Sequence, residues 1–113
     1  MLEQLKGPDY KNLRTVPALA AMNQVTIGSQ KAGDSFRITT QSGNTYLLEV
    51  TDPDATMAHL VRCDERPGAT KAGYRGVREV SPQIRVGHFF IHKGGGQDIS
   101  NTSRVAKIEQ IRL

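Results

Sequence analysis

The histidines and the single cysteine are the side chains of this chain best suited to metal binding or nucleophilic catalysis. His88 and His92 lie four residues apart, and His59 and Cys63 have the same spacing. The apolar residues 89–91 favour a strand, in which four residues span about 13 Å. That separation is too long for two imidazoles to bind one ion, or for an imidazole to activate a thiol. We therefore expect no metal site, no catalytic residue and no cofactor, and we favour a non-enzymatic protein over an enzyme.

The clearest chemical signal is a basic segment that contains an aromatic residue. Residues 66–93 hold six Lys or Arg against one acid, although the whole chain carries a net charge of only +4. Within residues 71–78, a tyrosine that can stack on a base lies among cations that can neutralise phosphates. The same run is also typical of a solvated surface hairpin. The candidate nucleic-acid contacts are Lys71, Tyr74, Arg75, Arg78, Arg85 and Lys93.

A run of three glycines, residues 94–96, follows the basic segment. It predicts a flexible loop over residues 93–100, and its backbone amides could alternatively form an anion nest. The loop lacks the Gly-Lys-Ser/Thr ending of a phosphate-binding P-loop. The glycine run is therefore interpreted first as a connection between elements.

From residue 25 onward, apolar and polar residues alternate with a period of two, and the elements that must position these side chains are therefore expected to be strands. Phe36 and Ile38 alternate with polar residues, and so do Tyr46 and Val50, which predicts two half-buried strands. Residues 42–44, Ser-Gly-Asn, predict a tight hairpin connection between them. Further strands are expected over residues 57–63 and 77–80.

The later elements are less regular. Residues 84–92 form the longest β-like run, and its apolar side changes phase near Gly87, which predicts one strand with a bulge. Residues 103–113 fit either a bulged closing strand, which we favour, or a short C-terminal helix.

Residues 1–23 differ in sequence pattern from the rest of the chain, where the period-two alternation begins at residue 25. Residues 15–22 predict one or two helical turns, with Thr15 as a cap and Pro17 in the first turn. We expect residues 1–23 to be an N-terminal arm with this short helix, serving as a lid or reaching a second subunit. Residues 24–113 then form one all-β domain, a small antiparallel barrel or rolled sheet of six to seven strands.

One cysteine excludes an intrachain disulfide and a multi-cysteine zinc site, and we expect Cys63 to be buried and inert. The first six residues contain no apolar stretch of the secretory type. The longest apolar run, residues 16–22, is far shorter than the roughly 18 residues that a membrane span needs. These features predict a cytoplasmic location and no membrane partner.

Three hypotheses for function follow. The first is a non-enzymatic binding module for an anionic partner, RNA or DNA, that uses the basic residues named above. The alternative is a homo-oligomeric interaction protein in which residues 1–23 contact a second subunit. The third, ranked lowest, is a small-molecule-binding barrel whose mouth contains His59, His88 or His92.

Overall fold

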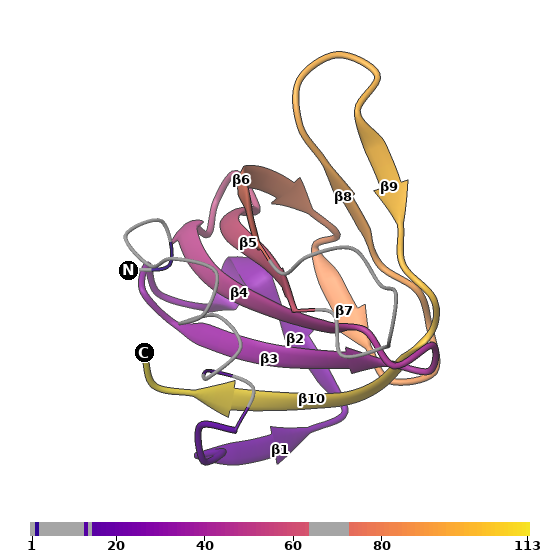
Figure 1. The fold of residues 1–113 in the computed structure, drawn as a ribbon. Helices are drawn as coiled ribbons and strands as arrows, with labels where there is room; N and C mark the ends of the chain where they lie inside the picture. Colours follow the sequence, from indigo (N-terminus) through magenta and orange to yellow (C-terminus); the bar gives the residue numbers. More distant parts are fainter. Residues whose placement is uncertain (1, 3–12, 14, 64–72) are drawn as a thin grey trace.

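The computed structural model describes residues 2, 13, 15–63 and 73–113 (Figure 1). Most of the described chain is antiparallel β-structure, in an eight-stranded sheet of order β1-β10-β3-β4-β5-β6-β8-β9 and a two-stranded sheet of β2 and β7. The strands and the one 3-10 turn are β1 Ala20–Met22, β2 Gln24–Thr26, η2 Ile27–Ser29, β3 Ser35–Thr40, β4 Thr45–Asp52, β5 Met57–Cys63, β6 Gly73–Val80, β7 Gln83–Arg85, β8 Ile91–Lys93, β9 Ile99–Asn101 and β10 Val105–Ile111.

The all-β prediction is confirmed, but the described strands do not close into a barrel. β1 and β9 lie at the two edges of the large sheet, and the β8–β9 hairpin projects from its body (Figure 1). The described chain contains ten strands rather than six or seven. Within the described residues, no helix is long and apolar enough to span a bilayer.

The hairpin predicted between residues 40 and 45 is confirmed. β3 and β4 pair antiparallel, with Thr39 opposite Thr45. Gly43 has a φ of +89°, a conformation that glycine adopts without the steric cost of a Cβ atom. The amide of Thr40 donates to the carbonyl oxygen of Asn44 at 2.9 Å, which closes the connection.

The single strand predicted over residues 84–92 is wrong. The chain turns at Gly87, whose φ is +89°, and divides into β7 and β8. β7 pairs with β2 in the small sheet, whereas β8 pairs with β6 in the large one. The phase change in the sequence therefore marks a change of sheet and not a bulge.

The C-terminal segment is a strand, as favoured, and not a helix. β10 pairs with β3 on one side and β1 on the other. Its register with β3 shifts between Val105 and Lys107, which is the expected bulge.

The helix predicted over residues 15–22 is wrong, because residues 15–19 are not helical and residues 20–22 form β1. The amide of Leu19 donates to the carbonyl oxygen of Gln110 at 2.8 Å, and Ala20–Met22 then pair with β10. A short isolated helix is marginal, whereas the edge of a sheet offers hydrogen-bond partners directly. Of residues 1–14 of the arm, only Leu2 and Leu13 belong to the described residues.

The large sheet is buried on both faces at its central strands β3 and β4, and Thr45–Val50 of β4 are all buried. One face contributes to a main core, the other to a second core. The main core contains Val25, Ile27, Phe36, Ile38, Tyr46, Leu48, Val50, Ala58, Leu60, Val80, Ile84, Phe90, Val105 and Ile108. The second contains Leu2, Leu47, Val61, Cys63 and Ile111, with Leu13 and Val16 packed against it. The arm therefore covers its own sheet at these residues, and Cys63 is buried as predicted.

Candidate functional site

A polar cavity lies at one end of the main-core face of the sheet. Its volume is about 510 Å³, within the range of roughly 300–1,000 Å³ that small-molecule sites occupy. It is lined by Tyr46, Arg62, Arg75, Arg78, His92, Asp98, Ser100 and Asn101. Three arginines and one carboxylate thus line a single cavity, which we call the arginine cavity.

Strand pairing brings these residues together from distant parts of the sequence. Tyr46 of β4 lies opposite Arg62 of β5, and His92 of β8 lies opposite Ser100 of β9. Directly opposed residues in an antiparallel pair point to the same face. Each of these pairs therefore delivers two lining side chains to the cavity.

A β-bulge places Arg75 in the cavity beside Arg78. In β6, Gly76 lies opposite Leu60 while Tyr74 lies opposite Val61, so Arg75 is an extra residue without a partner position. Gly76 has a φ of +94°, which permits the local kink. In a regular strand, residues 75 and 78 would point to opposite faces. The bulge shifts this alternation by one residue, and both arginines line the cavity.

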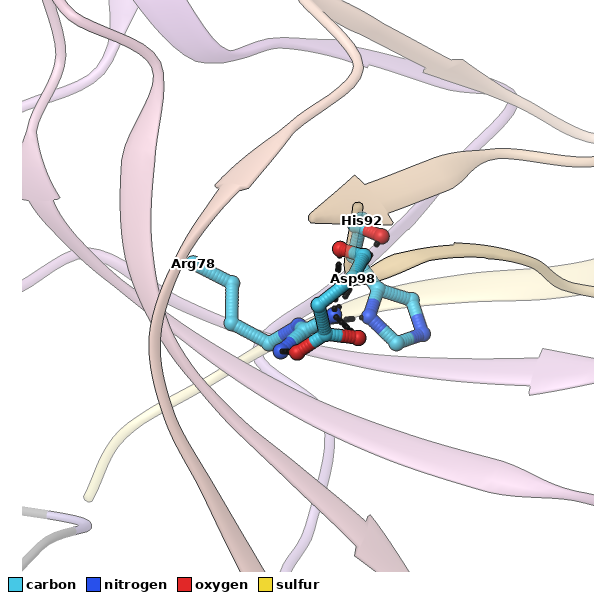
Figure 2. A network of polar contacts seen from close by, with 3 residues as sticks. All are labelled: Arg78, His92 and Asp98. Atoms are coloured by element: carbon cyan, nitrogen blue, oxygen red, sulfur yellow. Dashed lines mark hydrogen bonds and ion pairs between the residues drawn. The ribbon is translucent and has the colours of Figure 1, made fainter. Parts of the chain in front are cut away.

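Arg78 is the buried centre of a polar network with His92 and Asp98 (Figure 2). Its side chain donates from Nε to Nδ1 of His92 at 2.8 Å. Nη1 donates to Oδ2 of Asp98 at 2.8 Å, and Nη2 donates to Oδ1 at 3.1 Å. All three guanidinium nitrogens are therefore engaged within the protein, and Arg78 is only 7% exposed. Arg78 organises the wall of the cavity, because most of its donors are already used.

The glycine-rich turn between β8 and β9 is shaped to hold this network. The amide of Gly94 donates to the carbonyl oxygen of Asp98 at 2.9 Å. A Cβ atom at position 94 would lie 2.8 Å from Oδ2 of Asp98 and 3.0 Å from Nη1 of Arg78. Residue 94 must lack a side chain for the ion pair to occupy its present position. The predicted loop is thus a hairpin connection, and β9 after it was not predicted.

His92 is held in one protonation state and one tautomer. Burial is the main cause that lowers its pKa to about 4, and the Arg78 guanidinium lowers it further. His92 is therefore neutral at pH 7. Because Nδ1 accepts from Arg78, the single ring proton belongs on Nε2, the nitrogen facing away from Arg78 (Figure 2). The ring packs near Tyr46 and Phe90, with centroid distances of 6.1 and 6.2 Å.

Asp98 is the negatively charged member of this network. Its hydrogen bond with Arg78 is the main cause that lowers the pKa of its carboxyl group. Its side chain is nevertheless 57% exposed, so the carboxylate lies at the rim of the cavity.

Two of the six candidate contacts from the sequence, Arg75 and Arg78, line this cavity. Arg85 is exposed on β7, where it donates to Oε1 of Gln83, and does not line it. Lys93 does not line the cavity either.

Lys93 forms an ion pair with Glu79 at 3.7 Å, on the outer side of β6 and β8. Lys71 lies outside the described residues, as does the side chain of Tyr74, whose backbone belongs to β6. The basic segment is therefore divided between the cavity and separate surfaces.

Four lining residues were not singled out from the sequence: Arg62, Asp98, Ser100 and Asn101. Arg62 lies in a strand that is otherwise apolar except for His59, which is a usable signal for a functional cation. Asp98 lies two residues after the glycine run, and a hairpin there would have brought it back toward β8. Tyr46, which the alternation predicts on a half-buried strand, contributes to both the core and the cavity.

The three histidines do not share a pocket. His92 lines the arginine cavity, whereas His59 and His88 do not. Within the described part of the chain, no group of three or more His, Cys, Asp or Glu residues is placed to hold a metal ion.

Fold and site together define an open antiparallel β-domain with an arginine-rich cavity between β5, β6 and the β8–β9 hairpin. Comparison of the chain with protein-family models, with curated proteins and with solved structures finds no match.

Proposed function

We propose that this domain is a non-enzymatic binding module for an anionic partner, and that the arginine cavity receives the anionic group. The observation that supports this most directly is the convergence of three arginines on a cavity with one carboxylate. A concave surface lined mainly by one sign of charge concentrates oppositely charged partners. With His92 neutral, the lining side chains favour an anion.

The lining groups are better suited to binding than to proton transfer. A guanidinium stays protonated throughout the physiological range. The pKa of His92, about 4, is far from the neutral value that favours general acid–base catalysis. Hydrogen-bond donation to a bound anion needs neither group to change its charge.

Nucleic acid, RNA or DNA, is the candidate partner, because its phosphates match the donor geometry of arginine. A guanidinium can bind two phosphate oxygens at once through a planar fork of N–H groups. Arg75 is the exposed arginine of the cavity and is accessible to a partner. We assign it the first contact with the phosphate.

The test is fluorescence anisotropy of the full chain with a labelled, 5′-phosphorylated single-stranded oligonucleotide of mixed sequence. Arg75→Ala and Arg85→Ala each remove one exposed positive charge from a strand, but only Arg75 lines the cavity. We expect Arg75→Ala to weaken binding roughly tenfold and Arg85→Ala to weaken it less than about twofold. Equal weakening would show that binding depends on net charge alone. No binding by the unmodified protein would refute the proposed function.

A further inference from the structure

We infer that the group bound in the arginine cavity is a terminal phosphate, a phosphomonoester, rather than a phosphodiester within a continuous strand. This inference rests on the proposed function and specifies the chemistry of its ligand. The terminal phosphate can belong to the end of a nucleic-acid strand or to a small phosphorylated molecule. Both present the same group.

The cations of the cavity form a cluster and not a track. A strand bound along its length needs cations spaced along a track, one near each phosphate. Here Arg62, Arg75 and Arg78 converge on one cavity, whereas Arg85 and Lys93 do not line it. Converging charge suits one compact, highly charged group.

The donors and positive charges of the cavity match a group with more than one negative charge. A phosphomonoester carries about −1.5 to −2 charges at pH 7 and three strongly accepting oxygens, whereas an internal phosphodiester carries one charge. Arg75 supplies an exposed guanidinium group, Arg62 adds a second positive charge to the lining, and Nε2–H of His92 supplies a neutral donor. This donor set exceeds what a single diester charge requires.

A carboxylate lies at the rim of the cavity. Asp98 is 57% exposed and stays ionised because Arg78 holds it in an ion pair. A strand crossing the cavity would have to place a second phosphate near this rim, where like charges repel. A terminal group enters without that neighbour.

The size of the cavity indicates what accompanies the phosphate. A volume of about 510 Å³ is larger than a phosphate group alone needs, and falls in the range of small-molecule sites. Ser100 and Asn101 line it and offer neutral hydrogen-bonding groups. These suit the hydroxyl-bearing part that is esterified to the phosphate, such as a sugar.

The experiment compares four probes with the full chain in calorimetric or anisotropy titrations. They are inorganic phosphate, a nucleoside 5′-monophosphate, and one oligonucleotide sequence with either a 5′-phosphate or a 5′-hydroxyl. We expect the phosphorylated oligonucleotide to bind roughly tenfold more tightly than the hydroxyl form. Arg75→Ala should remove most of that difference, and Arg85→Ala should leave it intact.

The possible results distinguish a failure of the terminal-phosphate inference from a failure of the proposed binding function. Equal affinity for both oligonucleotides, with Arg75→Ala weakening both, would overturn the terminal-phosphate inference and leave the binding function standing. No binding of any probe would overturn both. A nucleoside monophosphate that binds as tightly as the phosphorylated strand identifies a small molecule as the ligand. A much tighter phosphorylated strand identifies a strand end.

Discussion

Nε of Arg78 donates a hydrogen bond to Nδ1 of His92 over 2.8 Å, and this bond determines how both side chains contribute to the cavity. It keeps one arginine nitrogen occupied within the protein. It also leaves Nε2 of His92 as the protonated nitrogen and therefore as a donor. The remaining guanidinium nitrogens bind Asp98, so one arginine positions both a histidine from β8 and a carboxylate from the β8–β9 turn.

The first prediction concerns pH. Folding lowers the pKa of His92 from 6.5 to about 4, so the unfolded chain binds a proton more readily than the folded one. The stabilisation is complete above the unfolded pKa and is lost as pH falls from 6.5 toward 4. We expect the free energy of unfolding to fall by about 2 kcal/mol between pH 7.5 and 5 from this residue alone. Urea denaturation at the two pH values measures it.

The matched control for this prediction replaces another histidine. His92→Gln removes the titrating group and keeps an oxygen that can accept from Arg78, so the pH dependence should largely disappear. His88→Gln changes an exposed histidine and should leave the pH dependence unchanged. An unchanged slope in His92→Gln would contradict the assignment.

The second prediction concerns the glycine-rich turn. In Gly94→Ala, the added methyl group must displace the carboxylate of Asp98 or the guanidinium of Arg78. Both are ends of side chains and can shift, so the protein should fold, but the hydrogen bond that lowers the pKa of Asp98 should weaken. We expect that pKa to rise toward its usual value of 3.8 in an NMR titration of the carboxyl carbon. Gly95→Ala meets open space and should leave it unchanged.

The third prediction concerns selectivity. If the ionised carboxylate of Asp98 excludes a continuing strand, then Asp98→Asn should improve binding of the 5′-hydroxyl oligonucleotide more than that of the phosphorylated one. The ratio of the two dissociation constants should fall toward one, as measured by anisotropy at low salt. Asp54→Asn removes an exposed carboxylate that does not line the cavity, and the ratio should then stay constant. An unchanged ratio in Asp98→Asn would show that the rim carboxylate does not determine this selectivity.

The fourth prediction concerns the far side of the sheet. Nε of Arg37 donates to Glu109 at 3.0 Å between two buried side chains, and its Nη1 donates to the carbonyl oxygens of Leu13 and Val16. Arg37→Met leaves a buried carboxylate and two carbonyls without this donor, which should lower the free energy of unfolding by about 3 kcal/mol. Lys107 contacts the same carboxylate at 3.4 Å from an exposed position. Lys107→Met should cost less than about 1 kcal/mol in the same denaturation experiment. Similar losses in both variants would contradict the role given to Arg37.

Local sequence patterns were sufficient where neighbouring residues determine the structure. The β3–β4 hairpin follows from alternation and from a glycine at the turn, and β10 follows from β-branched residues in a bulged pattern. Gly87 was ambiguous, because a glycine with positive φ serves both a bulge and a turn into another sheet. β1 could not be predicted locally, since its partner, β10, is at the other end of the chain.

The residues that line the cavity could be predicted only in part, because pairing between distant strands brings them together. Arg75 and Arg78 are close in sequence and belong to one basic run. Their shared face depends on a bulge whose register is set by β5. Arg62 and Asp98 reach the cavity through pairings that composition and spacing do not reveal.

The most direct test of the central claim is an NMR titration of the isotopically labelled full chain with a nucleoside 5′-monophosphate. We expect saturable shifts of the Nε2–H signal of His92 and of the backbone amides of the cavity residues Arg75, Arg78, His92, Ser100 and Asn101. The amide of Arg85, on β7, should not move. Shifts that centre on Arg85 and Lys93, or that grow without saturating across all basic residues, would contradict an anion site in the arginine cavity.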